Sequence, residues 1–185
     1  MKYLNSLIVG FFCLLLVSCG GLGPVRPVQN ADNALVYGNI QLPGDKVVSQ
    51  LIMHEYRVTY ITPFKNPPQA HVYDNGDFFF ENVKPGTYYL HRFLSGRTLY
   101  VFPYESMKEV DAATFEVKPG DVIYIGSFEV VNEKEEYIVP GSFELKALAN
   151  PDSLSILRHI AEITRGTGWD KRIESHIDQS MLSQN

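Results

Sequence analysis

Between Ala34 and Ala147 the chain repeats one short pattern, and this pattern limits the fold more than any other feature of the sequence. Stretches rich in Val, Ile, Phe and Tyr recur about every ten residues, separated by Gly, Pro, Asn and Asp. Short strands bounded by turn residues are typical of an antiparallel β-sandwich or barrel. The 11 Phe and 11 Tyr of the chain also favour a β-rich interior. The stretches are LVYGNIQL, HEYRVTYI, AHVYD, GDFFFENV, GTYYLHRFL, TLYVFP, ATFEV, DVIYIGSFEVV and SFELKAL.

Residues 149–185 differ from this pattern and predict helices. Asn150 is placed to cap a helix, and Pro151 suits the first helical position. Leu154 and Leu157 then begin a series of apolar residues at helical spacing. After a break at Gly166–Gly168, residues 170–178 predict a second short helix that carries Ile173 and Ile177 beneath Trp169. We therefore expect a mainly β domain at 34–148 with a C-terminal α-helical appendage at 149–185.

The most specific stretch is GDFFFENVKPGTYYL, residues 76–90. Asn75-Gly76 predicts a tight hairpin turn of the two-residue type, and Pro85-Gly86 suits the centre of a type II turn, as does Pro119-Gly120. Side chains alternate between the two faces of a strand, so one set of this stretch points into a core. That set is Phe78 and Phe80 in the first strand and Tyr88 and Leu90 in the second, and Val83 is expected to fill the corner between the strands.

This stretch fits the pattern GxFxFxNVxPGxYxL and resembles the hallmark hairpin of carboxypeptidase regulatory-like domains. The resemblance extends more weakly over residues 35–131, and it implies an antiparallel prealbumin-like (transthyretin-like) β-sandwich. In that family the domain accompanies peptidases and transporters without catalysing a reaction. The resemblance therefore implies a protein that is not an enzyme.

The first residues, MKYLNSLIVGFFCLLLVSC, have the features of an export signal. Lys2 supplies a positive charge, and the apolar run from Leu7 to Val17 is too short to span a bilayer, which requires roughly 20 residues. Leu16-Val17-Ser18-Cys19 resembles the lipobox of bacterial lipoproteins. That resemblance implies cleavage between Ser18 and Cys19, a diacylglycerol thioether on Cys19, and N-acylation (palmitate or a similar chain) of the new amino terminus.

We accordingly expect residues 1–18 to be a signal peptide and residues 19–33 to be a lipidated cysteine with a flexible tether. An ordinary cleaved signal and an uncleaved anchor are the alternatives. Gly20 is not the Asp that retains enterobacterial lipoproteins in the inner membrane, which favours the outer membrane, on its periplasmic face or its surface. Cys13 and Cys19 are the two cysteines, so the mature chain has none left for a disulfide. A net charge of −5 gives no reason to expect nucleic acid as a partner.

Strict alternation places four side chains on the outer face, away from Phe78 and Phe80. They are Phe79, Tyr89, His91 and Phe93. Such a row is either covered by the C-terminal helix or used as a partner surface. A protein partner in the cell envelope is the functional alternative.

No pattern in the sequence predicts catalysis or a cofactor other than the lipid. The five histidines are not paired at metal-ligand spacing, and no GxSxG, HExxH or phosphate-binding loop occurs. Asp74–Asp77 lacks the distal ligands of a calcium loop, and Gly166–Gly168 is a weak candidate for an anion site. We expect no metal site and no catalytic residues.

Three functions remain open on these grounds. The first is a lipid-anchored, non-catalytic binding or scaffolding module of the cell envelope. The second is an envelope hydrolase or carbohydrate-active accessory protein with an unrecognised site. The third is an abundant structural lipoprotein.

Overall fold

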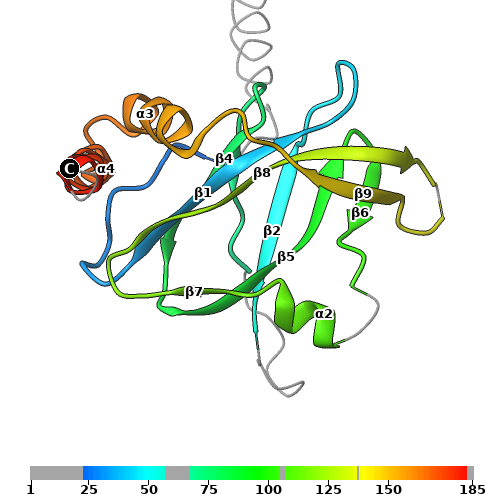
Figure 1. Ribbon diagram of the computed structural model, residues 1–185, viewed down its shortest axis with the longest axis horizontal. Coiled ribbons are helices and arrows are strands. Elements are labelled where there is room, and N and C mark those ends of the chain that lie inside the picture. The colour runs from blue at the N-terminus through cyan, green and yellow to red at the C-terminus, as the bar shows by residue number, and fades with distance from the viewer. Residues whose placement is uncertain (1–22, 57–66, 105–106, 137, 183–185) are drawn as a thin grey trace, which may run out of the picture.

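The structure is a computed structural model that describes residues 23–56, 67–104, 107–136 and 138–182. It contains two β-sheets and a layer of C-terminal helices (Figure 1). The five-stranded sheet has the order β3 (His71–Val72), β4 (Asp77–Val83), β1 (Ala34–Gln41), β8 (Val122–Lys134) and β9 (Ser142–Ala147). The four-stranded sheet has the order β2 (Gln50–Glu55), β5 (Gly86–Ser95) and β6 (Thr98–Val101), with β7 (Phe115–Val117) also paired to β5.

The expectation of a mainly β domain followed by helices is confirmed, but the sheets are not wholly antiparallel. β1 and β8 are parallel neighbours in the five-stranded sheet. Parallel neighbours require a crossover connection. Here the crossover is long, because the chain leaves β1, builds much of both sheets and only then returns as β8.

An inter-sheet core fills the space between the two sheets. The side chains of the GDFFFENVKPGTYYL stretch that were expected to point inward all belong to it. Phe93 stacks on Tyr100 with ring centroids 4.8 Å apart, and Phe143 meets Phe93 edge-on at 5.0 Å. The motif residues of this core are Phe78, Phe80, Val83, Tyr88 and Leu90.

The turns around this motif differ from the prediction in two of three cases. The β3–β4 hairpin closes with the Gly76 N–H donating to the Tyr73 carbonyl at 2.9 Å, and Gly76 is left-handed at φ +84° while Asn75 is not. This is a three-residue loop rather than a two-residue one. Gly86 has no positive φ and starts β5, so Pro85-Gly86 is not the centre of a type II turn, whereas Gly120 has the required positive φ of +75°.

Two C-terminal helices cover the outer face of the five-stranded sheet. They are α3 (Ser153–Ile163) and α4 (Trp169–Leu182). The cap of α3 is Asp152, whose carboxylate accepts the Ser155 N–H at 2.8 Å, so Asn150 is not the cap. The apolar faces of both helices join Leu35, Tyr37, Phe79 and Val122 in a second cluster, the helix-covered core, which includes Ile173 as predicted.

The segment before β1 is not a free tether along its whole length. Residues 26–33 are hydrogen-bonded to β4 and α4. The sequence gives no sign of this because the segment, RPVQNADN, has no apolar periodicity and its partners lie far along the chain. Ser18 and Cys19 lie outside the described residues.

Some expectations are only partly covered. The predicted strand HEYRVTYI corresponds to the end of β2, and Val58 and Tyr60 lie outside the described residues. The short helix α2 (Met107–Ala112), between β6 and β7, was not predicted. Within the described ranges, no helix is long and apolar enough to cross a membrane.

Candidate binding cleft

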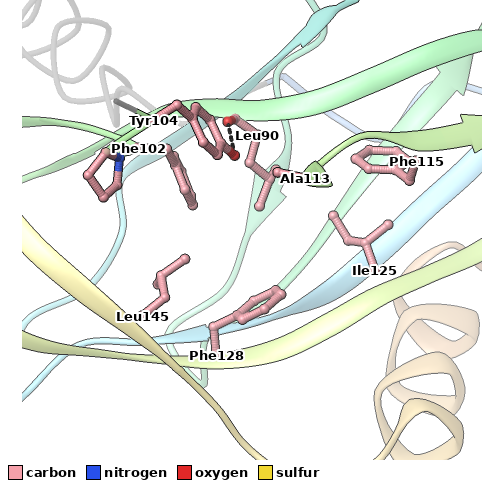
Figure 2. A pocket seen from close by; sticks show the side chains of 9 residues that line it. Leu90, Phe102, Tyr104, Ala113, Phe115, Ile125, Phe128 and Leu145 are labelled. Atoms are coloured by element: carbon pink, nitrogen blue, oxygen red, sulfur yellow. Dashed lines mark hydrogen bonds between the residues drawn. The ribbon is translucent and has the colours of Figure 1, made fainter. Parts of the chain in front are cut away.

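An apolar cleft of about 330 Å³ lies between the two sheets, next to the segment that joins α2 to β7 (Figure 2). Among the described residues, no charged side chain lines it and one side-chain hydroxyl does, that of Tyr104, which donates to the Leu90 carbonyl at 3.0 Å. Burial, with a smaller contribution from Tyr89, raises the pKa of Tyr104 to about 12, so the hydroxyl stays neutral at physiological pH. The lining is Leu90, Phe102, Pro103, Tyr104, Ala113, Phe115, Ile125, Phe128 and Leu145.

A β-bulge in β8 gives the cleft one of its walls. Tyr37 pairs with Tyr124 and Asn39 with Ser127, so β8 has one more residue than β1 in this interval. Residues three apart point to opposite faces of a regular strand, but the extra residue turns both Ile125 and Phe128 toward the cleft. The bulge therefore turns what would be one wall residue into two.

Gly126 is the residue that makes this bulge possible. Its φ is +124°, and a Cβ built there would lie 2.5 Å from Cζ of Phe128. The Phe128 ring therefore lies close to the backbone of Gly126, where no side chain intervenes. Figure 2 shows the position of Phe128 in the cleft. Glycine tolerates both the backbone conformation and the close approach.

A second bulge, in β5, changes the predicted outer face. Ile52 pairs with Arg92 and Met53 with Leu90, which leaves His91 as the extra residue. The alternation reverses at that point, so Leu90 and Phe93 both point into the inter-sheet core. The expectation that Phe93 faces outward is therefore wrong, and its side chain is fully buried.

The other three residues of the expected partner surface lie on two separate faces. Phe79 is fully buried in the helix-covered core, which is the covered alternative that the sequence left open. Tyr89 and His91 lie half-buried on the outer face of the four-stranded sheet. The four side chains therefore do not form one surface.

Tyr89 and His91 belong to an aromatic group that the sequence did not indicate. The rings of His54 and His91 stack with centroids 3.9 Å apart, and Tyr104 meets Tyr89 edge-on at 5.8 Å. Burial, then the neighbouring His91 and Arg92, lower the pKa of His54 to about 4. Burial and Arg92 also lower the pKa of His91. Both rings are neutral near pH 7 and act as aromatic packing groups.

Two buried carboxylate side chains elsewhere in the domain connect separate secondary-structure elements. Asp77 at the start of β4 accepts from Asn39 at 2.7 Å and lies 2.7 Å from Nδ1 of His159, which attaches α3 to the hairpin. Glu81 in β4 lies 2.7 Å from Nε of Arg26 and 3.4 Å from Nε2 of His71. These contacts hold separate segments together.

The weak candidates for ion sites have structural explanations. The carboxylate of Asp170 accepts the N–H groups of Gly166 and Gly168 at 2.9 and 3.1 Å, which satisfies the backbone donors that an anion would need. In the stretch Asp74–Asp77, where the sequence favours a plain turn over a calcium loop, Asn75 and Asp77 bond to each other. Among the described residues, no group of three or more His, Cys, Asp or Glu side chains is placed to hold a metal ion.

Comparison of the chain with protein-family models, with curated protein sequences and with solved structures returned no match.

Proposed function

We propose that the protein is a lipid-anchored, non-catalytic binding module of the cell envelope, held at the outer membrane. The observation that carries this proposal is the sequence Leu16-Val17-Ser18-Cys19 after a short apolar run. Two or three acyl chains on one cysteine anchor a domain stably, since each buried CH₂ contributes about 0.8 kcal/mol. No other cofactor is proposed.

The finer fold, a prealbumin-like sandwich, is part of the same proposal. Two features support it: the sheets pack face to face, and the motif side chains of residues 76–90 fill the space between them. The five motif side chains of the inter-sheet core then have structural roles. This favours a module that supports an interaction over one that performs a reaction.

The apolar cleft is the proposed binding site, with an envelope protein as the partner. Its volume falls at the lower end of the range for small-molecule pockets, roughly 300–1,000 Å³, which suits one or two apolar side chains of a partner. Aromatic rings supply much of the lining, and aromatic residues dominate the energetics of protein interfaces. Leu145, at 36% exposure, brings the lining to the surface.

The hydrolase alternative requires carboxylates or a histidine that converge on a concave site. The described part of the cleft lining has neither, and the pairs Asp77–His159 and Glu81–His71 connect structural elements instead. The alternative of an abundant structural lipoprotein differs from the proposal in copy number and in a deletion phenotype of weakened envelope integrity.

Two measurements test the proposal. Mass spectrometry of the amino-terminal peptide from the membrane fraction is expected to show a diacylglyceryl, N-acylated Cys19, and Cys19→Ala is expected to abolish it. A photo-crosslinker at Leu145 is expected to capture one repeatable protein, while a crosslinker at Leu182, which is 76% exposed on α4, is not. An unmodified Cys19, or equal capture at both positions, contradicts the proposal.

A further inference from the structure

The segment 26–33 is held against the domain by side chains from two elements. Glu81 of β4 accepts both the backbone N–H and Nε of Arg26, each at 2.7 Å. Asn82 accepts the Gln29 N–H at 2.9 Å and donates to the Pro27 carbonyl at 3.1 Å. From α4, the indole of Trp169 donates to the Arg26 carbonyl at 3.2 Å. We call residues 26–33 the strap.

The strap is a fixed part of the fold. The Glu81 side chain is 3% exposed and Trp169 is fully buried, so undocking the strap leaves buried polar groups without partners. Burial alone would raise the pKa of Glu81, but hydrogen bonds from His71 and Arg26 hold it below its usual value, so the carboxylate is charged at neutral pH. Val25 and Val28 pack on the helix-covered core as well.

The contacts also give the strap a direction. Gln29 and Pro27 bond to Asn82, and Arg26, closer to the amino terminus, bonds to Glu81. Followed backward from β1, the strap therefore runs along β4 from its end toward its start. Val25 and Tyr73 of the β3–β4 hairpin each pack against the helix-covered core. The chain thus leaves the domain toward that hairpin.

Docking shortens the chain that separates the domain from a lipid on Cys19. The six steps from Cys19 to Val25 reach at most about 20–22 Å, whereas the fifteen steps to Ala34 would reach about 50–54 Å. A domain of this length has a radius of gyration of about 15 Å and is roughly 40 Å across. The shorter connection cannot pass around the domain, but the longer one can.

We propose that the strap fixes which end of the domain faces the bilayer: the β3–β4 hairpin lies toward the membrane, and the α2 end lies away from it. This inference rests on the proposed lipidation of Cys19. Figure 1 shows α2 at the end of the molecule opposite the start of β4. Ala113 and Phe115, which follow α2, line the cleft. The partner therefore reaches the cleft from the aqueous side, and it is a soluble domain rather than a lipid.

Energy transfer to the membrane tests this orientation. The mature chain has no cysteine except the proposed lipidated Cys19, so Asp74→Cys in the hairpin and Lys108→Cys in α2 each introduce one free thiol for a donor dye. Both positions are exposed. The full-length lipoprotein is placed in vesicles that contain headgroup-labelled acceptor lipid. We expect transfer from position 74 to exceed transfer from position 108 at least about twofold, because the two ends are separated by much of the domain diameter.

Arg26→Pro combined with Asn82→Gly and Arg172→Ala is the strap-release variant, because it removes the bonds of residue 26 to Glu81, those of Asn82 to the strap, and those of Arg172 to the strap. Asn82 has φ +55°, so glycine keeps the backbone conformation while the side-chain bonds are lost. In this variant the ratio between positions 74 and 108 is expected to fall to about one, since the connection regains its full reach. Lys146→Ala, which removes an exposed ion pair to Glu129 on the β8–β9 side of the five-stranded sheet, is the control and keeps the ratio.

The possible failures are distinguishable. Equal transfer from both positions on protein whose Cys19 carries lipid by mass spectrometry overturns the orientation and leaves the proposed function intact. An unmodified Cys19 overturns both. A release variant that still unfolds cooperatively, at whatever denaturant concentration, but keeps the twofold ratio shown by Lys146→Ala shows that the strap does not set the orientation.

Discussion

The bulge at Gly126 allows a sharp test of how the cleft is built, through the substitution Gly126→Ala. An L-residue at φ +124° is strained, and such strained residues cost about 1–3 kcal/mol. The new Cβ also overlaps the Phe128 ring, with its nearest atom at 2.5 Å, and overpacking of a core costs typically 1–3 kcal/mol. We expect Gly126→Ala to lower the free energy of unfolding by about 2–5 kcal/mol and to push Phe128 into the cleft.

Gly96→Ala is the matched control. Gly96 also has a positive φ, +57°, but a Cβ there meets nothing within 4 Å, so only the backbone cost of about 1–2 kcal/mol applies. The assay is urea unfolding of residues 20–185, followed by fluorescence of Trp169, the single tryptophan, which is fully buried. Equal destabilisation by the two substitutions would refute the account of Gly126 as the glycine that accommodates Phe128.

Three further predictions follow from buried side chains. The folded-state pKa of Glu81 is lowered, so its contribution to stability is present above the unfolded pKa of about 4.3 and is lost as pH falls through the folded pKa. In urea unfolding, Glu81→Gln should reduce the loss of unfolding free energy at acid pH. His54 has a folded-state pKa of about 4 and an unfolded one of about 6.5, so stability should fall as pH drops from 6.5 to 4. An NMR titration should give the low pKa, and His54→Gln should remove that part of the pH dependence of stability. Phe93→Ala should cost about 3–5 kcal/mol, because the ring is fully buried against Tyr100 and Phe143, whereas a surface phenylalanine would cost little; thermal unfolding distinguishes the two.

Period-two alternation predicted the inter-sheet core of the hairpin but not the faces beyond a bulge. Phe78 and Phe80 lie where the alternation places them, because β4 is regular across them in its pairing with β1. The same argument fails at Phe93, since the extra residue His91 reverses the alternation. Nothing in GTYYLHRFL marks that position, so the sequence alone could not have placed Phe93.

The bulge in β8 did have a signal in the sequence. Gly126 interrupts DVIYIGSFEVV, and an isolated glycine in a strand indicates a bulge or a close approach of another group. Both occur at Gly126. The strap could not be predicted in this way, because its partners Glu81, Asn82 and Trp169 lie more than 50 residues along the chain and nothing local indicates the pairing.

The two faces of β8 connect the cleft to the helical layer. On one side of the Gly126 bulge, Tyr124 contacts the ring of Tyr37 in the helix-covered core, and the Ser127 hydroxyl donates to the Pro151 carbonyl at 2.7 Å, just before α3. On the other side, Ile125 and Phe128 line the cleft. The bulge sets the direction of all four side chains, so the cleft wall and the attachment of α3 are built from the same backbone segment of β8. The strap, which is bonded to α4, adjoins the same helical layer.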